Sequence, residues 1–269
     1  MGKDSDIQWC HHTFNPWWGC VRVSPGCEHC YAEAFDKRVG RADWGVKAPR
    51  RFFGEKHWAE PLKWDRAAAA AGDRHRVFCA SMSDVFEARL DLAKERLRLW
   101  DLIHATTNLD WLLLTKRPEN LMLMLPWGQG GEPWPNVWVG TTVEDERRAQ
   151  ERIPILRAVP AVVRFLSMEP LLELPTSLDL TGIHWVIAGG ESGHRARHFD
   201  LAWARSLRDR CKAAGAAFFF KQAGTNPVEL SQVSELNGAV GLMQLSLKDG
   251  HGGDMEEWPE ELRVREFPR

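Results

Sequence analysis

The stretch HWVIAGGES, residues 184–192, is a short apolar run that ends in two glycines and two polar residues. Near-continuous apolar runs of this length are typical of strands that are buried on both faces, as in parallel sheets. Five more runs of the same kind occur along the chain from residue 76 onward, and we predict a buried strand for each. They are RVFCAS (76–81), WLLLT (111–115), NVWVGTT (136–142), VVRFLS (162–167) and AAFFFKQ (216–222).

Helical patterns lie between these runs. In residues 201–214 the apolar residues recur at steps of three and four, which is the spacing of one helix face, and residues 91–105 show a similar face. Strands that alternate with helices predict βα units joined by right-handed crossovers. A further strand is expected to lead into the cysteine-rich loop near residue 20. We therefore predict an α/β fold, a partial or complete (β/α) barrel of about seven parallel strands.

Length and charge limit the organisation of the chain. Its 269 residues fit one or two domains, and a barrel of strands and helices uses this length as one unit. We predict a barrel over residues 1–224 and a C-terminal extension or lid over residues 225–269, where the pattern is weaker. The net charge of −2 gives no overall reason to expect nucleic acid, so any such contact would need a local basic surface.

The amino-terminal stretch MGKDSDIQWC is charged and lacks an apolar run, so we expect no secretory signal there. No stretch of the sequence approaches the roughly 20 apolar residues that span a bilayer. We therefore expect a cytoplasmic protein without a membrane partner. In that reducing compartment, clustered cysteines are more often metal ligands or catalytic groups than disulfides.

Polar residues follow the predicted strands at the point where each strand ends. The carboxyl ends of parallel strands are where α/β folds build their sites. Carboxylates there could hold an amine or a ribose hydroxyl, and Lys116, Arg117 and Lys221 could bind an anion. The alternative is that these groups cap helices or form structural ion pairs. The candidates for cofactor binding are Ser83, Asp84, Glu144, Glu169, Gly189, Gly190, Glu191 and Ser192, and those for catalysis are Cys79, Lys116 and Lys221.

Three of the six cysteines, Cys20, Cys27 and Cys30, stand close together behind a Ser-Pro-Gly turn. Their spacing is compatible with zinc and with an iron–sulfur cluster. Three thiolates on a four-iron cluster would leave one iron without a protein ligand, open to a small molecule. A structural zinc site usually takes four protein ligands, so here it would have to be completed by Cys10, His11, His12 or His29.

The Cys-x-x-Cys pair followed by Tyr31 and Ala32 resembles the cluster loop of the radical S-adenosylmethionine (SAM) superfamily. That superfamily usually spaces its first two cysteines three residues apart, whereas six residues separate them here. A closer resemblance is to a phage-associated three-cysteine family of unassigned activity (DUF5131-like), from about residue 7 to 224. It is carried by the blocks GCVRVSPGCEHCYAE, SMSDVFE, LLLTKRPENL, VWVGTTVE, VRFLSMEPLLE, WVIAGGESG and FFFKQAG.

The resemblance implies a barrel of the radical SAM type, with a 4Fe-4S cluster held by Cys20, Cys27 and Cys30. Its chemistry would be reductive cleavage of SAM to a 5′-deoxyadenosyl radical that abstracts hydrogen from a substrate, with a flavodoxin or ferredoxin as electron donor. Tyr31 would pack beside the cluster and exclude water. Cys79 could return a hydrogen atom to a substrate radical, although a buried cysteine is more often a core residue. The alternative is a non-catalytic, zinc-stabilised nucleic-acid-binding protein.

Residues 37–64 combine many Lys and Arg with aromatic residues, as single-strand nucleic-acid binders do. If nucleic acid binds there, the cations would meet phosphates and a tryptophan would stack on a base. The interpretation that we favour is a solvated loop whose aromatic residues close the bottom of the barrel. The residues that test the first interpretation are Arg50, Arg51, Lys56, Trp44 and Trp58.

Overall fold

Within residues 2–231 and 241–268, which the computed structural model describes, seven strands form the main sheet in the order β1-β4-β5-β6-β7-β8-β10. The pairs β1–β4, β4–β5, β5–β6, β7–β8 and β8–β10 are parallel. All six predicted runs form strands, and the sheet begins with β1 and ends with β10, so the α/β prediction is confirmed as a partial barrel. The strands are β1 (His12–Phe14), β4 (His75–Cys79), β5 (Leu109–Thr115), β6 (Val137–Thr142), β7 (Val163–Met168), β8 (Trp185–Gly189) and β10 (Ala217–Gln222).

The helix predicted over residues 201–214 is α7 (Leu201–Ala214). It begins where the Asp200 side chain accepts a hydrogen bond from the backbone of Ala202, and it ends at Gly215 in the left-handed conformation. The second predicted helix is α4 (Ala93–Ala105), which follows a 3-10 turn, η2 (Leu90–Leu92). In the part of the chain that the structure describes, every helix is too short or too polar for a bilayer span. The other helices are α1 (Tyr31–Arg38), α2 (Glu55–Trp58), α3 (Glu60–Ala71), α5 (Leu121–Met124) and α6 (Glu146–Ala158).

The chain divides into two compact units. Unit 1 comprises Met1–Thr141 and Pro154–Arg164, and unit 2 comprises Thr142–Ile153 and Phe165–Arg269. Unit 1 therefore contains β1, β4 and β5, and unit 2 contains β8, β10 and α7. The predicted boundary after residue 224 stays a prediction.

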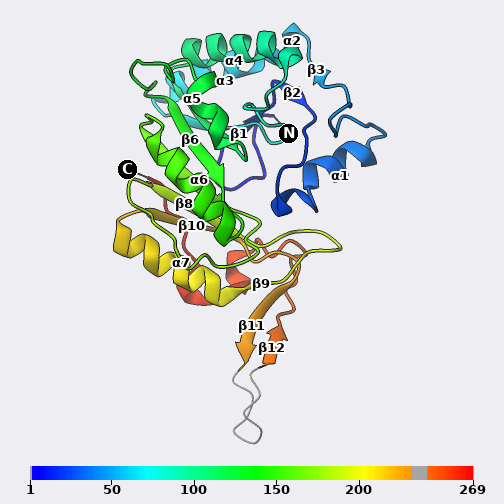
Figure 1. The fold of residues 1–269 in the computed structure, drawn as a ribbon, viewed down its shortest axis with the longest axis vertical. Coiled ribbons are helices and arrows are strands. Elements are labelled where there is room, and N and C mark those ends of the chain that lie inside the picture. Colours follow the sequence, from blue (N-terminus) through cyan, green and yellow to red (C-terminus); the bar gives the residue numbers. More distant parts are fainter. Residues whose placement is uncertain (1, 232–240, 269) are drawn as a thin grey trace, which may run out of the picture. The chain divides into compact units, whose positions relative to one another are not determined.

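Unit 1 has its core on the strands β1, β4 and β5. Val77, Trp111 and Leu112 are fully buried there, as expected for apolar runs covered on both faces. The Trp111 ring meets the Phe14 ring edge-on at 5.7 Å between centroids, and its indole N–H donates to the Thr106 hydroxyl at 3.0 Å. Helices α3 and α4 lie side by side in this unit (Figure 1). This packed core fixes the positions of β1, β4 and β5, and therefore the positions of the loops that follow these strands.

Residues 37–64 contain regular structure rather than one long loop. The strand β3 (Arg51–Phe52) pairs antiparallel with β2 (Trp17–Trp18), and α2 and the start of α3 follow. Trp58 and Trp64 are buried. The aromatic residues at these two positions therefore pack inside unit 1, as in the favoured interpretation.

Unit 2 is covered by α7, which lies along β8 and β10 (Figure 1). The predicted extension also belongs to this unit, because β11 (Pro227–Ser231) pairs with β9 (Phe199–Asp200) and with β12 (Gly241–Gln244). Two short 3-10 turns follow, η4 (Met255–Glu257) and η5 (Glu260–Leu262). Trp258 is buried and its ring lies 4.6 Å from that of Phe220. The stretch around Trp258 thus packs on the main sheet, whereas β11 and β12 form a separate sheet with β9, and the role of the extension as a lid stays a prediction.

Candidate functional site

The three clustered cysteines lie on one loop of unit 1, which follows β1 and β2 and leads into α1. Cys27 ends the short 3-10 turn η1 (Pro25–Cys27), and Cys30 is the N-cap residue of α1. The loop is attached to the end of β4, because the Gly19 N–H donates to the Met82 carbonyl at 3.0 Å. The loop that carries the three cysteines therefore begins beside the chain that follows β4, and metal binding by its thiols stays a prediction.

Gly19 is required by a close backbone approach just before the first cysteine. It adopts a φ of +107°, which favours glycine, and a Cβ at this position would lie 2.3 Å from the Asp43 carbonyl oxygen. The Gly45 N–H in turn donates to the Cys20 carbonyl at 2.9 Å. The segment around residues 43–45 thus lies directly against the backbone of Cys20.

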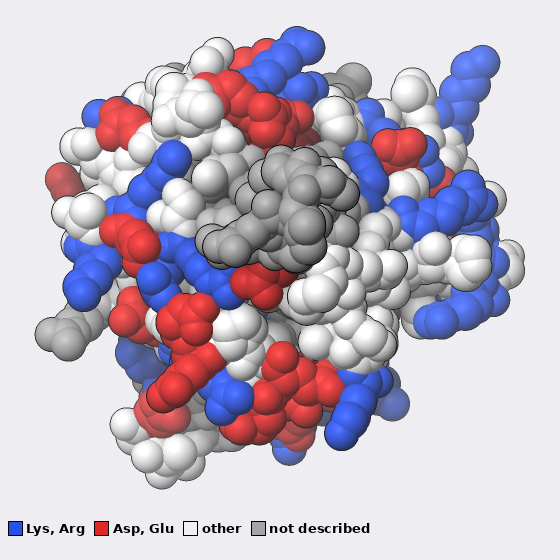
Figure 2. All heavy atoms as spheres, turned by 90° about the horizontal axis from the view of Figure 1, so that it is seen from below, with Lys and Arg blue, Asp and Glu red and all other residues white. Residues whose placement is uncertain are grey.

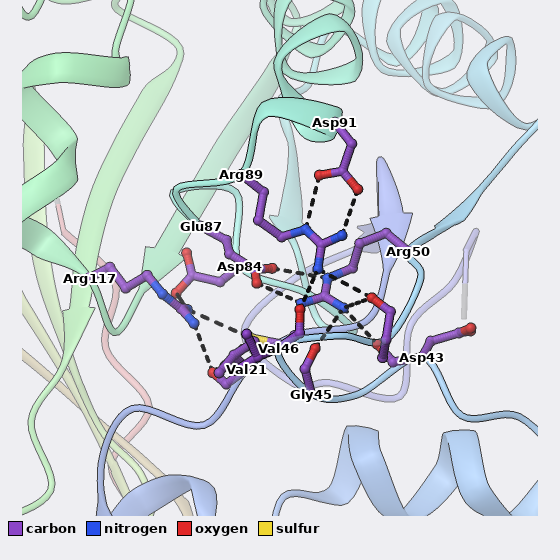
Figure 3. Close-up of polar contacts among 12 residues, drawn as sticks. Val21, Asp43, Gly45, Val46, Arg50, Asp84, Glu87, Arg89, Asp91 and Arg117 are labelled. Atoms are coloured by element: carbon purple, nitrogen blue, oxygen red, sulfur yellow. Dashed lines mark hydrogen bonds and ion pairs between the residues drawn. The ribbon is translucent and has the colours of Figure 1, made fainter.

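Arg50 holds that segment in place from inside the protein (Figure 3). Its guanidinium donates to both carboxylate oxygens of Glu87, at 2.6 and 3.1 Å, and to the carbonyls of Asp43, Gly45 and Ala48. The side chains of Arg50 and Glu87 are almost completely buried. A bidentate pair of this kind fixes both partners in a single geometry.

Cys20 is the cysteine of the loop that meets a cation. Arg117 donates from Nη1 to its Sγ at 3.6 Å and from Nη2 to the Val21 carbonyl at 2.8 Å (Figure 3). Burial raises the pKa of the Cys20 thiol to about 12, and Asp84 adds to that rise while Arg117 opposes it. A metal would therefore have to displace the proton of this thiol.

Asp84 is buried and accepts several hydrogen bonds. Its carboxylate accepts from the Thr115 hydroxyl and the Arg117 guanidinium, both at 2.8 Å, and from the backbone N–H of Lys116 at 3.1 Å. It also accepts from the Phe86 N–H at 2.9 Å. Asp84 thus ties the end of β4 to the end of β5 and orients Arg117.

The three clustered cysteines differ from the other three in exposure. Cys20, Cys27 and Cys30 are partly exposed residues, whereas Cys10, Cys79 and Cys211 are buried. Within the described ranges, no three His, Cys, Asp or Glu side chains are grouped so that one metal ion could bind. Cysteine thiolates are the usual ligands of a four-iron cluster, which carries each thiolate on a different iron.

Two other predicted residues of unit 1 lie near this loop but in different surroundings. The Ser83 hydroxyl is buried without a hydrogen-bond partner in the structure, and Ser83 forms an isolated β-bridge with Gly19. Tyr31 is 55% exposed, and the prediction that it packs beside a bound cluster and excludes water stays a prediction. Its hydroxyl donates to the Ser81 carbonyl at 2.9 Å, which joins the start of α1 to the chain after β4.

The remaining cysteines are core residues. Cys79, at the end of β4, is completely buried, and burial strongly raises the pKa of its thiol. Cys10 and Cys211 are buried as well. This agrees with the expectation that isolated cysteines pack in the core. The catalytic roles suggested for Cys79 and Lys116 stay predictions.

The predicted carboxylates of unit 2 all form ion pairs. Glu144 is fully buried and pairs with Arg152 at 2.9 Å, while Glu169 pairs with Lys221. Glu191 pairs with Arg197 and also accepts from the backbone N–H of that residue at 2.9 Å. Each of these three carboxylates is thus paired with a cation of unit 2, and its contact with a cofactor stays a prediction.

The glycine pair after β8 is explained by chain packing. A Cβ on Gly190 would lie 2.5 Å from the Ala223 carbonyl, and one on Gly189 would lie 3.1 Å from the Gln222 carbonyl. The end of β10 and the residue after it thus lie against these two glycines, and the close approach of a ligand to their backbone stays a prediction. Ser192 follows, partly exposed.

Two residues predicted to contact nucleic acid are buried, so that detail of the prediction is wrong. The Arg50 guanidinium forms an ion pair with Glu87, and the Arg98 guanidinium lies 4.4 Å from the centre of the Trp58 ring. Trp44 is partly exposed and Lys56 is exposed. The Arg51 guanidinium lies over the rings of Trp18 and Phe53, at 4.6 and 5.1 Å.

Figure 2 shows acidic and basic side chains interspersed on the face that it draws. Ion pairs between acidic and basic side chains also occur in unit 2, where Arg205 bonds both Glu229 and Glu261. A nucleic acid would therefore need a local surface rather than this mixed face.

Sequence reasoning missed the residues that support the loop from behind. Asn15 is one of them, since its side chain donates to the Ser81 hydroxyl at 3.0 Å and accepts from the Met82 N–H at 2.7 Å. Glu87 is another, through its pair with Arg50. Both lie in or beside the quoted blocks, but nothing in their spacing identifies the residues that they contact.

The chain resembles known proteins at two levels. Its sequence matches, over residues 4–245, the family described as "Protein of unknown function (DUF5131)". No curated protein matches it significantly. In fold it is similar to a spore photoproduct lyase variant with bound AdoMet and dinucleoside spore photoproduct, with a TM-score of 0.50 and 13% identity over 98% of this chain and 75% of the other. Spore photoproduct lyase complexed with dinucleoside spore photoproduct gives a TM-score of 0.48 with the same identity and coverage. The first likeness shows that the partial barrel of this chain shares its fold with that lyase.

Proposed function

The chain belongs to this family of unknown function, and from that premise we propose that it is an iron–sulfur enzyme of the radical SAM type. The observation that carries the proposal is the loop of Cys20, Cys27 and Cys30. Three cysteines whose residues are partly exposed follow the first strand of a partial barrel, although the Cys20 thiol itself is largely buried, while the other three cysteines are buried residues. This arrangement separates ligand cysteines from core cysteines.

The three thiolates would hold a 4Fe-4S cluster and leave one iron without a protein ligand. When bound, a reduced cluster supplies the electron that cleaves SAM to methionine and a 5′-deoxyadenosyl radical, with a flavodoxin or ferredoxin as the source of the electron. The task of this chain is to hold the loop: Arg50, Asp84 and Arg117 fix it from inside unit 1.

The carboxylates after β7 and β8 remain our candidates for the amine and ribose hydroxyls of SAM. Glu169 and Glu191 each form one ion pair, with Lys221 and Arg197. An ionised carboxylate has about four acceptor positions, so an ion pair does not exhaust its capacity. Glu144 is the weakest of the three candidates because it is fully buried.

We further propose that the substrate is a nucleotide or nucleic acid. The support lies in unit 1, where Arg51 covers Trp18 and Phe53, and Arg38 covers the ring of Phe35 at 5.1 Å. Each of these guanidinium groups could move from its ring to a phosphate, which would leave the ring face free to stack on a base. The dinucleoside bound by spore photoproduct lyase, whose fold is similar, is consistent with this class of substrate.

Metal analysis after anaerobic purification and reconstitution tests the proposed cofactor. We expect about four irons and four sulfides per chain, and little iron in the variant in which Cys20, Cys27 and Cys30 are all replaced by Ala. The variant Cys211→Ala is the matched control and should keep its iron, because Cys211 is buried in α7. A colourless protein that carries one zinc would instead support the alternative, a zinc-stabilised nucleic-acid-binding protein.

A further inference from the structure

Arg117 contacts the Cys20 sulfur directly, in addition to holding the backbone of the cysteine loop. We propose that Arg117 is a positioning residue for Cys20 and that its hydrogen bond to the sulfur raises the reduction potential of the cluster. The inference rests on the proposed iron–sulfur function and deepens it, since it concerns how this chain sets the potential of that site.

The geometry joins one guanidinium to two consecutive residues of the cysteine loop. Nη1 lies 3.6 Å from the Cys20 sulfur, and Nη2 donates to the Val21 carbonyl at 2.8 Å (Figure 3). Arg117 is only 7% exposed, so water screens these contacts little. The two contacts together fix the direction in which the Cys20 sulfur points.

The guanidinium is itself held before any metal binds. Asp84 accepts from its Nη1 at 2.8 Å, and the Arg117 backbone N–H donates to the Thr115 hydroxyl at 2.9 Å. That hydroxyl donates in turn to Asp84 at 2.8 Å. The arginine is therefore preorganised by residues at the ends of β4 and β5, outside the cysteine loop.

The same contacts disfavour the expectation that Arg117 binds an anionic ligand. Its Nη1 is used by Asp84 and Cys20, and its Nη2 by Val21. A ligand carboxylate would have to break a buried ion pair to reach it. Lys116 contacts Asp84 through its backbone N–H, so this contact does not involve the Lys116 ammonium group.

The sulfur atoms of Cys20 and Cys27 lie near hydrogen-bond donors that differ in charge. Among the described residues, Cys20 receives a hydrogen bond from a cation, whereas the Cys27 sulfur lies 4.0 Å from the neutral Ser24 hydroxyl. Reduction adds one negative charge to a cluster, and donors to a ligand sulfur stabilise that charge. Asp84 offsets part of the charge of Arg117, but the hydrogen bond acts on the sulfur directly.

The test is a redox titration of the reconstituted protein, followed by electron paramagnetic resonance. At a fixed potential, Arg117→Gln should lower the ratio of reduced to oxidised cluster about tenfold, which is about 59 mV for a one-electron couple. Arg117→Lys keeps the charge and should show a smaller shift. Arg74→Gln is the control, because Arg74 pairs with Asp110 in β5 instead of a cysteine sulfur, and it should leave the ratio unchanged.

A second readout works without metal. Hydrogen exchange of residues 19–30 in the iron-free chain should be faster in Arg117→Gln than in wild type. If the variants hold iron at the wild-type potential, the inference about the potential is overturned. If wild type takes up no iron, the proposed function fails, and the positioning role is decided by exchange alone: unchanged rates in Arg117→Gln would overturn it.

Discussion

At the scale of single residues, the buried pair of Arg50 and Glu87 is the clearest source of stability in unit 1. Both side chains are almost inaccessible to solvent, and Arg50 also satisfies three backbone carbonyls. Removing one partner of such a pair leaves the other charge buried without compensation, which typically costs about 3–5 kcal/mol. We therefore expect Arg50→Met to lower the free energy of unfolding by that amount, measured by urea denaturation.

The exposed pair of Lys63 and Glu60, 2.7 Å apart on α3, provides the control for Arg50→Met. Lys63→Ala should change the free energy of unfolding by no more than about 0.5 kcal/mol. Equal effects of the two substitutions would show that Arg50 is not the anchor described above.

At the scale of elements, three histidines pack together where β1 and β4 begin. The His12 Nε2 lies 3.1 Å from the His75 Nδ1, and the His12 Nδ1 accepts from the Asp4 N–H at 3.3 Å. The His11 Nδ1 accepts from the Arg76 N–H at 2.8 Å. These contacts need neutral rings, because an accepting ring nitrogen cannot carry a proton.

This cluster predicts a pH dependence of stability. Burial, with smaller contributions from His75 and His11, lowers the pKa of His12 to about 4, whereas the ordinary value is 6.5. The unfolded chain therefore binds more protons between these values, so stability is complete above pH 6.5 and falls as the pH drops toward 4. The loss should reach at most about 3 kcal/mol. His12→Phe, which can keep the ring stacked on Trp64, should show a shallower fall in urea titrations; an unchanged slope would contradict this origin.

The strand pair β2–β3 and helix α1 carry the cationic aromatic surface proposed for nucleic acid, made of Trp18, Phe35, Arg38, Arg51 and Phe53. If Arg38 and Arg51 each neutralise one phosphate, replacing both by Ala should flatten the log–log salt dependence of single-strand binding by about 1.4 units. Salt titrations with labelled oligonucleotides measure this slope. Arg147→Ala with Arg208→Ala, which removes one exposed and one partly exposed arginine of unit 2, should leave this slope unchanged. Absence of binding at low salt would eliminate this surface as a nucleic-acid site.

At the scale of the whole molecule, the sequence predicts the sheet well and the contacts of the site poorly. The apolar runs predict the strands because burial on both faces imposes a composition that is visible locally. The cysteine spacing identifies the loop, but the partners of its residues are distant along the chain. Arg117 contacts Cys20 across 97 positions, and the function of Arg50 depends on Glu87, 37 positions away. A basic residue in a basic stretch gives no local sign that it is buried.

The central claim is that this chain uses its three-cysteine loop to cleave SAM reductively. The direct measurement is chromatographic quantification of 5′-deoxyadenosine after anaerobic incubation of the reconstituted protein with SAM and dithionite. We expect wild type to form this product, even slowly and without substrate, and we expect none from the variant in which Cys20, Cys27 and Cys30 are replaced by Ala. Equal product from both proteins, or none from wild type that carries about four irons, would contradict the account.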